Sequence, residues 1–183
     1  LMMPQLSLHA STLRQGRVRQ VDYDANTITL DRRIDKADML VGRVIILNSG
    51  LHRTSYEIVA VSETDNLTTL HFGDIPMIVG VGNVSAVDAQ AGKVTTSTAF
   101  GRFCVNGADY RGRRLLNYDR SEAAYIEAFD QTTFDVRGRL GSAFDPDDDT
   151  CRRFWISDVG VNDQWAIPTV ITMERDAAGK WMI

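Results

Sequence analysis

A short pattern that occurs twice constrains this chain more than any other feature of its sequence. Residues 16–22 and 82–88 both read Gly-x-Val-x-x-Val-Asp, and a turn and a threonine-rich strand follow each copy. Three further landmarks recur in the same order, namely a Gly-Arg pair, a tyrosine and a Thr-Thr step before an apolar residue. All of them repeat after roughly 65 residues, and a constant period of this kind indicates a duplicated structural unit. We therefore expect two copies of one small module.

Each copy is expected to consist of β-strands. Short runs rich in Val, Ile, Thr, Tyr and Phe recur between Gly, Asn and Asp turns, and helical periodicity is almost absent. The one helix candidate, 121–129, reads almost as well as a strand. Expected strands cover residues 16–23, 27–30, 42–47, 54–61, 68–72, 83–87, 93–96, 113–117, 132–136, 154–157, 167–173 and 180–183.

The sequence therefore predicts an all-β fold, either a β-sandwich or paired small barrels. We expect two duplicated units of about five strands each, followed by a C-terminal strand extension. A lone sheet of roughly 65 residues buries too little surface to be robust, so we expect the two copies to share one core. Residues 1–15 form a linker or leading strand, 16–81 the first repeat, 82–141 the second, and 142–183 an extension packed on the repeats.

Composition narrows the classes of function. The 183 residues include 20 Lys+Arg and 24 Asp+Glu, which gives a net charge of −4 and a pI near 5.3. A nucleic-acid partner is not expected, because such binding needs clustered positive charge. A hydrophobic content of 44% excludes intrinsic disorder, and no apolar run approaches the ~18 residues of a membrane span. Both ends look like those of an excised piece, so we expect a domain of a longer protein.

The two cysteines leave two interpretations open. Cys104 and Cys151 have no partner at CxxC spacing, so a structural metal site is not expected. They either form one disulfide, which would imply an exported protein, or remain two buried thiols.

Arginines and tyrosines gather between residues 110 and 120. Guanidinium groups match the geometry of carboxylate and sulfate, and aromatic rings suit the apolar faces of sugars. This combination predicts a patch for acidic polysaccharide, although an edge strand that carries charge to prevent aggregation explains the same residues. The predicted glycan-binding residues are Tyr110, Arg111, Arg113, Arg114, Tyr118 and Arg120.

An acidic loop is the only metal candidate in the sequence. Asp145, Asp147 and Asp149 form the first half of a DxDxD calcium loop, but the next glycine in register is replaced by Thr150, and no bidentate Glu follows. Calcium is therefore the one cofactor considered, and a solvated acidic loop is the other interpretation.

Three residue types that catalysis could use lie close together around residue 52. His52, Arg53 and Tyr56 bring together a base, a cation and a phenol, which an elimination on a uronic acid would need. Strand alternation places His52 and Tyr56 on one face and Arg53 on the other. We therefore expect no catalytic residue here, and a small independent enzyme is the least favoured function.

The last third of the chain carries a recurring combination of motifs. A strand is followed by an Asp-x-Gly-x-x-Asp loop, an Ile-Pro strand and a Gly-x-aromatic strand, at residues 154–163, 167–168 and 179–181. This ending resembles the β-rich C-terminal domains of heparinase II/III-like polysaccharide lyases, with Asn162 in place of an expected glycine. The Gly42-Arg43 pair and the Tyr56-x-Ile58 strand are similar to the same regions.

The resemblance implies a non-catalytic accessory domain of a secreted polysaccharide-degrading enzyme. The family's catalytic Tyr, His and Arg belong largely to preceding domains, so no catalytic residue is carried over. The implied partners are the catalytic domain of the same parent chain and acidic polysaccharide, and the implied location is secreted, periplasmic or on the cell surface. A structural or adhesive module of a cell-surface or phage-tail assembly is the alternative, because duplicated β units build rigid extended shapes.

Overall fold

The computed structural model of the chain describes residues 14–97, 110–130, 132–138, 140–141 and 143–168, together with 174–175 and 181–182. Strands make up 53% of the structure and helix only 3%, which confirms the predicted all-β class. The helix candidate at 121–129 is a strand. No helix in the described part of the chain is long and apolar enough to cross a membrane.

Two consecutive units and a C-terminal segment make up the fold. The first unit contains β1 (Arg14–Asp22), β2 (Thr27–Leu30), the short 3-10 helix η1 (Ala37–Leu40), β3 (Val44–Asn48), β4 (Arg53–Glu57), β5 (Ala60–Thr64) and β6 (Leu67–His71). The second unit contains β7 (Ile78–Asp88), β8 (Lys93–Thr96), β9 (Arg114–Leu116), β10 (Glu122–Asp130) and β11 (Thr133–Gly138). The C-terminal segment supplies β12 (Arg153–Ser157), β13 (Gln164–Ile167), and the paired strands β14 (Glu174–Arg175) and β15 (Trp181–Met182).

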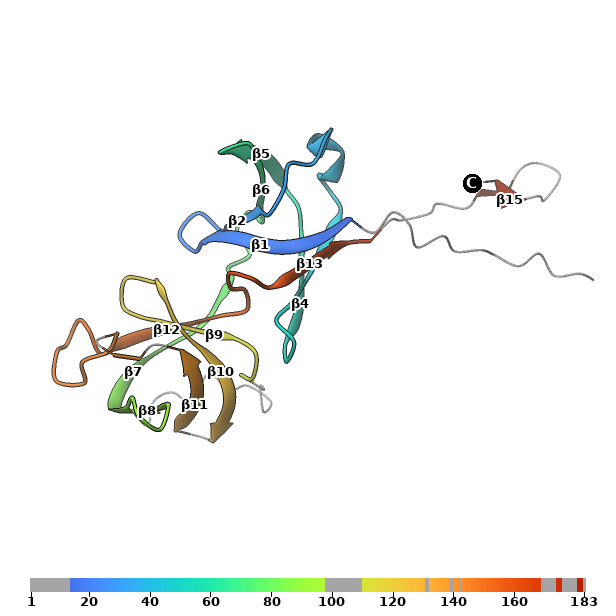
Figure 1. The fold of residues 1–183 in the computed structure, drawn as a ribbon. Coiled ribbons are helices and arrows are strands. Elements are labelled where there is room, and N and C mark those ends of the chain that lie inside the picture. The colour runs from blue at the N-terminus through green and yellow to red at the C-terminus, as the bar shows by residue number, and fades with distance from the viewer. Residues whose placement is uncertain are drawn as a thin grey trace, which may run out of the picture.

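Both units are curled sheets of the same design. The second unit closes into a six-stranded barrel in the order β10-β11-β8-β7-β12-β9, and the first forms a seven-stranded sheet in the order β4-β3-β13-β1-β2-β6-β5. In the first unit, the two edge strands β4 and β5 are consecutive in the chain. In the second unit, the single long strand β10 occupies the positions of both. Figure 1 shows the two units side by side, the first in blue to teal with red β13, and the second in green to orange.

The C-terminal segment completes both units instead of only packing on them. β12 lies between β7 and β9 of the second unit, and β13 lies between β1 and β3 of the first. The chain therefore runs through the first unit, then the second, and then returns strand by strand to each. The predicted repeat boundary at 81/82 lies inside β7, which begins at Ile78.

The duplicated pattern occupies matching places in the two units. Gly16 pairs with Trp165 on β13, and Gly82 pairs with Phe154 on β12. The register shifts directly after Val18 in β1 and directly after Val84 in β7, so both copies carry a bulge at the same place. A conserved bulge position indicates that the two hairpins share one backbone design.

A second correspondence surrounds the Gly-Arg pairs. The amide of Gly42 donates to the Ile58 carbonyl at 2.8 Å, and that of Gly112 donates to Ile126 at 2.7 Å. Ile58 therefore matches Ile126, and this register matches Tyr56 with Ala124 instead of Tyr125. Matching the two tyrosines from the sequence is wrong by one residue, which in a strand moves a side chain to the opposite face.

The expectation of one shared core is wrong. One buried cluster fills the first unit around Trp165, Phe72 and Leu70, and a separate cluster fills the second around Phe134 and Phe154. Curling each sheet directs one face of every strand into its own interior. The C-terminal strands bring a large aromatic to each interior, which lets each small unit enclose a cluster of its own.

Candidate functional site

The outer face of four adjacent strands in the first unit forms the candidate site. Along β3 and β13, Leu47 and Trp165 point into the core, while Ile46, Asn48 and Ala166 point outward and are half-buried. Strand pairing places these outward residues side by side across β4, β3, β13 and β1.

Two rows of side chains cross this face. One row consists of Arg53, Asn48, Gln164 and Arg17, which are paired from strand to strand; we call it the arginine row. The neighbouring row consists of Ser55, Ile46, Ala166 and Gln15. The face is hollowed, with a cavity of about 620 Å³; we call it the outer-face hollow. It is lined by the arginine row, by Ile46, Ala166 and Gln15 of the neighbouring row, and by Asp31 and Arg32, which directly follow β2.

Asp31 organises the end of the hollow nearest to β1. Its carboxylate accepts the Arg17 backbone N–H at 3.0 Å, the Trp165 Nε1–H at 3.2 Å and the Arg32 Nε–H at 3.3 Å. Burial alone raises the pKa of Asp31, but these hydrogen bonds outweigh it and lower the pKa below its usual value. Gly16 is required beside it, because a Cβ at that position would overlap the Asp31 carboxylate.

The hollow carries an excess of positive charge. Arg17, Arg32 and Arg53 line it together with a single carboxylate, that of Asp31. Arg32 is held by Asp31 and lies 5.7 Å from the centre of the Trp165 ring. The Arg17 Nη1 group donates to the Asn162 carbonyl at 2.9 Å. Arg53 is exposed, and within the described ranges its side chain has no ion-pair or hydrogen-bond partner.

The second unit shows the same face covered. The strand pairing shows that Trp155 on β12 occupies the position in the second unit that Ala166 occupies in the first. The loop that follows β9 covers this tryptophan. Its Nε1–H donates to the Tyr118 carbonyl at 3.3 Å, and Arg120 lies 4.6 Å from its ring centre. Of the two matching faces, the first unit's is therefore the one left open.

The predicted patch at 110–120 divides into buried and exposed members. Tyr110 is buried in the second core, and Arg114 is only 6% exposed. Arg114 forms ion pairs with Asp163 and with Glu122, the latter at 3.0 Å, and Arg113 lies 2.5 Å from Asp158. These two guanidinium groups therefore meet carboxylates of their own chain.

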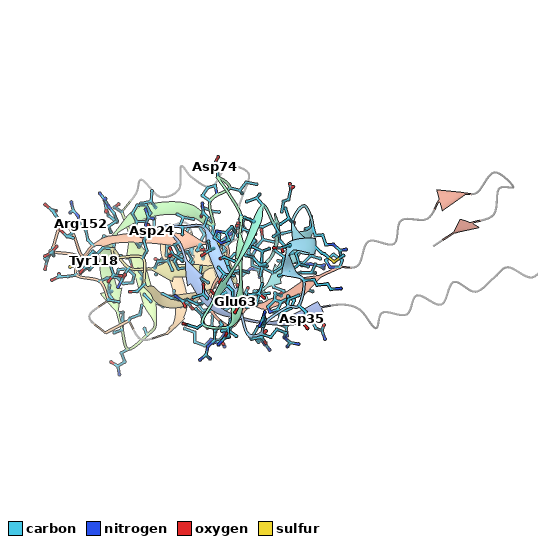
Figure 2. The ribbon with its side chains drawn as sticks, turned by 90° about the horizontal axis from the view of Figure 1, so that it is seen from above. Asp24, Asp35, Glu63, Asp74, Tyr118 and Arg152 are labelled. Carbon is cyan, nitrogen blue, oxygen red and sulfur yellow. The ribbon has the colours of Figure 1, made fainter. Side chains whose placement is uncertain are left out.

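The other three members lie at the surface. Arg111 is exposed, Tyr118 is 44% exposed, and Arg120 forms an ion pair with Asp24 of the first unit. In Figure 2, Tyr118 and Arg152 lie at one end of the molecule, and Asp35 lies toward the other. Glycan binding by Arg111, Tyr118 and Arg120 stays a prediction.

The loop between β12 and β13 forms the junction between the units. His52 Nε2 of the first unit lies 3.1 Å from Asp158 Oδ1, on the carboxylate that also pairs with Arg113. Tyr56 faces the same carboxylate, whereas Arg53 faces the hollow, in keeping with the expected alternation. The loop's two aspartates, Asp158 and Asp163, thus tie the units together.

The junction carboxylates differ in pKa because their surroundings differ. Burial raises the pKa of Asp158, but hydrogen bonds from His52 and Arg113 outweigh it and lower the pKa below its usual value. Burial raises the pKa of Asp163 and Glu122, and their shared partner Arg114 only partly offsets this.

The acidic loop shows no metal geometry. Within the described ranges, no group of three His, Cys, Asp or Glu side chains is placed to hold a metal ion. Asp145 Oδ1 accepts the Asp147 backbone N–H at 3.0 Å, and Asp149 forms an ion pair with Arg152 at 2.7 Å. Cys151 is a free, half-buried thiol, and Cys104 lies outside the described residues.

Comparison of the chain with models of protein families, with curated proteins and with solved structures finds no match.

Proposed function

We propose that this chain is a non-catalytic accessory β domain of a secreted polysaccharide-degrading enzyme, and that it binds acidic glycan in the outer-face hollow. The observation that carries the proposal is the convergence of Arg17, Arg32 and Arg53 on one open hollow, while the matching face of the second unit is covered by its own loop. In that enzyme, the catalytic domain of the same parent chain would be its partner.

The chemistry of the hollow suits an anionic sugar chain. Guanidinium groups bind carboxylates and sulfates through paired hydrogen bonds. The side-chain amides of Asn48 and Gln164 supply donors and acceptors for hydroxyl groups, and half-buried Ile46 and Ala166 form an apolar floor beside them in the neighbouring row. The proposal moves glycan binding away from Arg113 and Arg114, whose charges are used inside the protein.

The positions of the three candidate catalytic groups also favour a binding role over a catalytic one. His52 and Tyr56, the base and phenol of the catalytic set considered from the sequence, both meet the Asp158 carboxylate. Arg53, the cation of that set, lies on the other face. The three groups therefore do not converge on one substrate position.

Affinity electrophoresis tests the proposal. The protein is run through gels that contain heparin, chondroitin sulfate, alginate or pectin, and we expect at least one of them to retard it. The Arg17→Ala/Arg53→Ala variant should lose this retardation. The Arg19→Ala/Arg153→Ala variant removes the same charge from exposed positions outside the hollow and should keep it. If no acidic glycan retards the wild type, or both variants behave alike, the proposed binding site is wrong.

A structural or adhesive module is the second candidate, and the junction favours it. Contacts between the units include the hydrogen bond from the Tyr125 hydroxyl to the Ser49 carbonyl at 3.3 Å, the Arg120–Asp24 ion pair and the Asp158 carboxylate that His52 and Arg113 share. Such contacts hold two small units in one orientation, which a rigid spacer needs. Small-angle scattering that fits a single orientation, together with no glycan binding, would favour this candidate.

A further inference from the structure

The positive charges of the outer-face hollow are separated into two ends. Arg53 stands on β4 and Arg17 on β1, three strand spacings apart in the arginine row. At ~4.8 Å per spacing, their backbones are roughly 14 Å apart.

The two ends are also prevented from closing on one anion. The bond from Arg17 Nη1 to the Asn162 carbonyl, at 2.9 Å, holds that guanidinium at the β1 end. Asp31 and the Trp165 ring hold Arg32 at the same end. A single carboxylate or sulfate therefore meets either Arg53 or the Arg17–Arg32 pair.

The middle of the row is neutral and polar. Asn48 Oδ1 accepts the Gly50 backbone N–H at 2.8 Å, so its side-chain NH₂ is the part that remains to donate. Gln164 beside it is exposed. Hydroxyl or ring oxygens of sugars fit this stretch, and no carboxylate of the protein interrupts the row itself.

We propose that the outer-face hollow binds an acidic oligosaccharide laid across the strands, with one anionic group at Arg53 and a second at the Arg17–Arg32 end. This inference rests on the proposed function and adds a selection by chain length. Two weak contacts joined in one ligand reinforce each other, because the second forms at a high effective concentration. A fragment too short to span the row makes only one of them.

Titration calorimetry with oligogalacturonides and heparin oligosaccharides fractionated by length tests the inference. For the wild type, we expect the affinity to rise at least about tenfold once the chain spans both ends, because the second contact then forms within the same complex. In Arg53→Ala the rise should disappear, while the affinity for the disaccharide stays within about twofold, because the disaccharide can still bind at the Arg17–Arg32 end, which the substitution leaves unchanged. Gln164→Glu, which places a negative charge in the middle, should weaken the long chains most.

Matched measurements separate the inference from the function on which it rests. Arg153 occupies the position in the second unit that corresponds to Gln164 in the first. The Arg153→Ala variant is therefore the control and should leave the dependence of affinity on chain length unchanged. A wild type that binds acidic glycan with the same dependence on length as Arg53→Ala would overturn two-ended binding and leave the proposed function intact. A wild type that binds no acidic glycan of any length would overturn both.

Discussion

Arg114 shows how single residues hold the junction between the units together. It is buried between the Asp163 and Glu122 carboxylates and also lies 4.7 Å from the centre of the Tyr125 ring. Gly160 makes room for it, since a Cβ there would overlap the Arg114 side chain. A buried cation of this kind is costly to remove alone, because the buried Asp163 carboxylate and the partly exposed Glu122 carboxylate then lose their partner.

Replacing Arg114 by leucine is expected to destabilise the protein by about 3–5 kcal/mol, the usual result of breaking a buried ion pair from one side. Arg33→Leu breaks only an exposed pair with Glu63 and should cost less than about 1 kcal/mol. Denaturant unfolding measures both free energies. Equal losses in the two variants would show that the Arg114 pairs do not stabilise the junction.

The lowered pKa of Asp158 predicts how the stability of the fold changes at acidic pH. Its pKa is lowered from 3.8 in the folded protein, so its contribution to stability is present above pH ~4 and is lost as the pH falls through the lowered value. Asp163 and Glu122 act in the opposite sense, because their pKa values are raised and the folded state binds their protons more readily.

The Asp158→Asn variant isolates this effect. Below pH ~4 its free energy of unfolding should approach that of the wild type, and toward neutral pH the wild type should be more stable. Unfolding curves at a series of pH values measure the difference. A difference that is constant with pH would mean that the charge of Asp158 does not contribute.

At the scale of elements, the two glycines that precede β3 and β9 form the same turn in two different surroundings. Gly42 and Gly112 share a φ of +81° and make the same backbone bond. A Cβ on Gly42 would meet nothing within 4 Å, whereas one on Gly112 would overlap the backbone of His52. The same turn is therefore open in one unit and pressed against the neighbouring unit in the other.

Alanine at the two positions should separate these effects. Gly42→Ala carries only the backbone strain of the left-handed region, about 1–2 kcal/mol. Gly112→Ala carries the same strain and also displaces the loop that holds His52, so its loss of unfolding free energy should be clearly larger. Thermal and denaturant unfolding give the comparison. If Gly42→Ala were the more damaging change, the close approach at Gly112 would not be as described.

At the scale of the whole molecule, β12 and β13 determine which unit can still fold when the end of the chain is removed. β13 lies between β1 and β3 and brings Trp165 and Ile167 to the first core. β12 closes the second barrel without it.

A chain that ends at Asp163 should therefore lose the first unit and keep the second. Limited proteolysis with mass spectrometry is expected to show cleavage within residues 14–77 and protection of strands β7 to β12. The full-length chain, treated in the same way, is the control. Protection of 14–77 in the shortened chain would mean that the first unit folds without β13.

The sequence by itself determined the all-β class, most of the strands and the repeated hairpin. It did not determine β10, which coincides with the helix candidate at 121–129, or β13, which ends where the strand expected at 167–173 begins. Alternating apolar residues, Gly, Asn and Asp turns and the repeated Gly-x-Val-x-x-Val-Asp pattern are local, and each copy adopts the same bulge. Even the placement of His52 and Arg53 on opposite faces of the sheet follows from the two-residue period of a strand.

Only the tertiary structure decided which arginines are buried and which face the solvent. Arg113 and Arg114 resemble Arg17 and Arg53 in the sequence, but the first two meet Asp158 and Asp163 across more than 40 residues of chain. The hollow exists because β13 inserts between β1 and β3. Pairing between strands that are distant in the chain depends on the packing of whole sheets, and no local pattern encodes which charges will meet there.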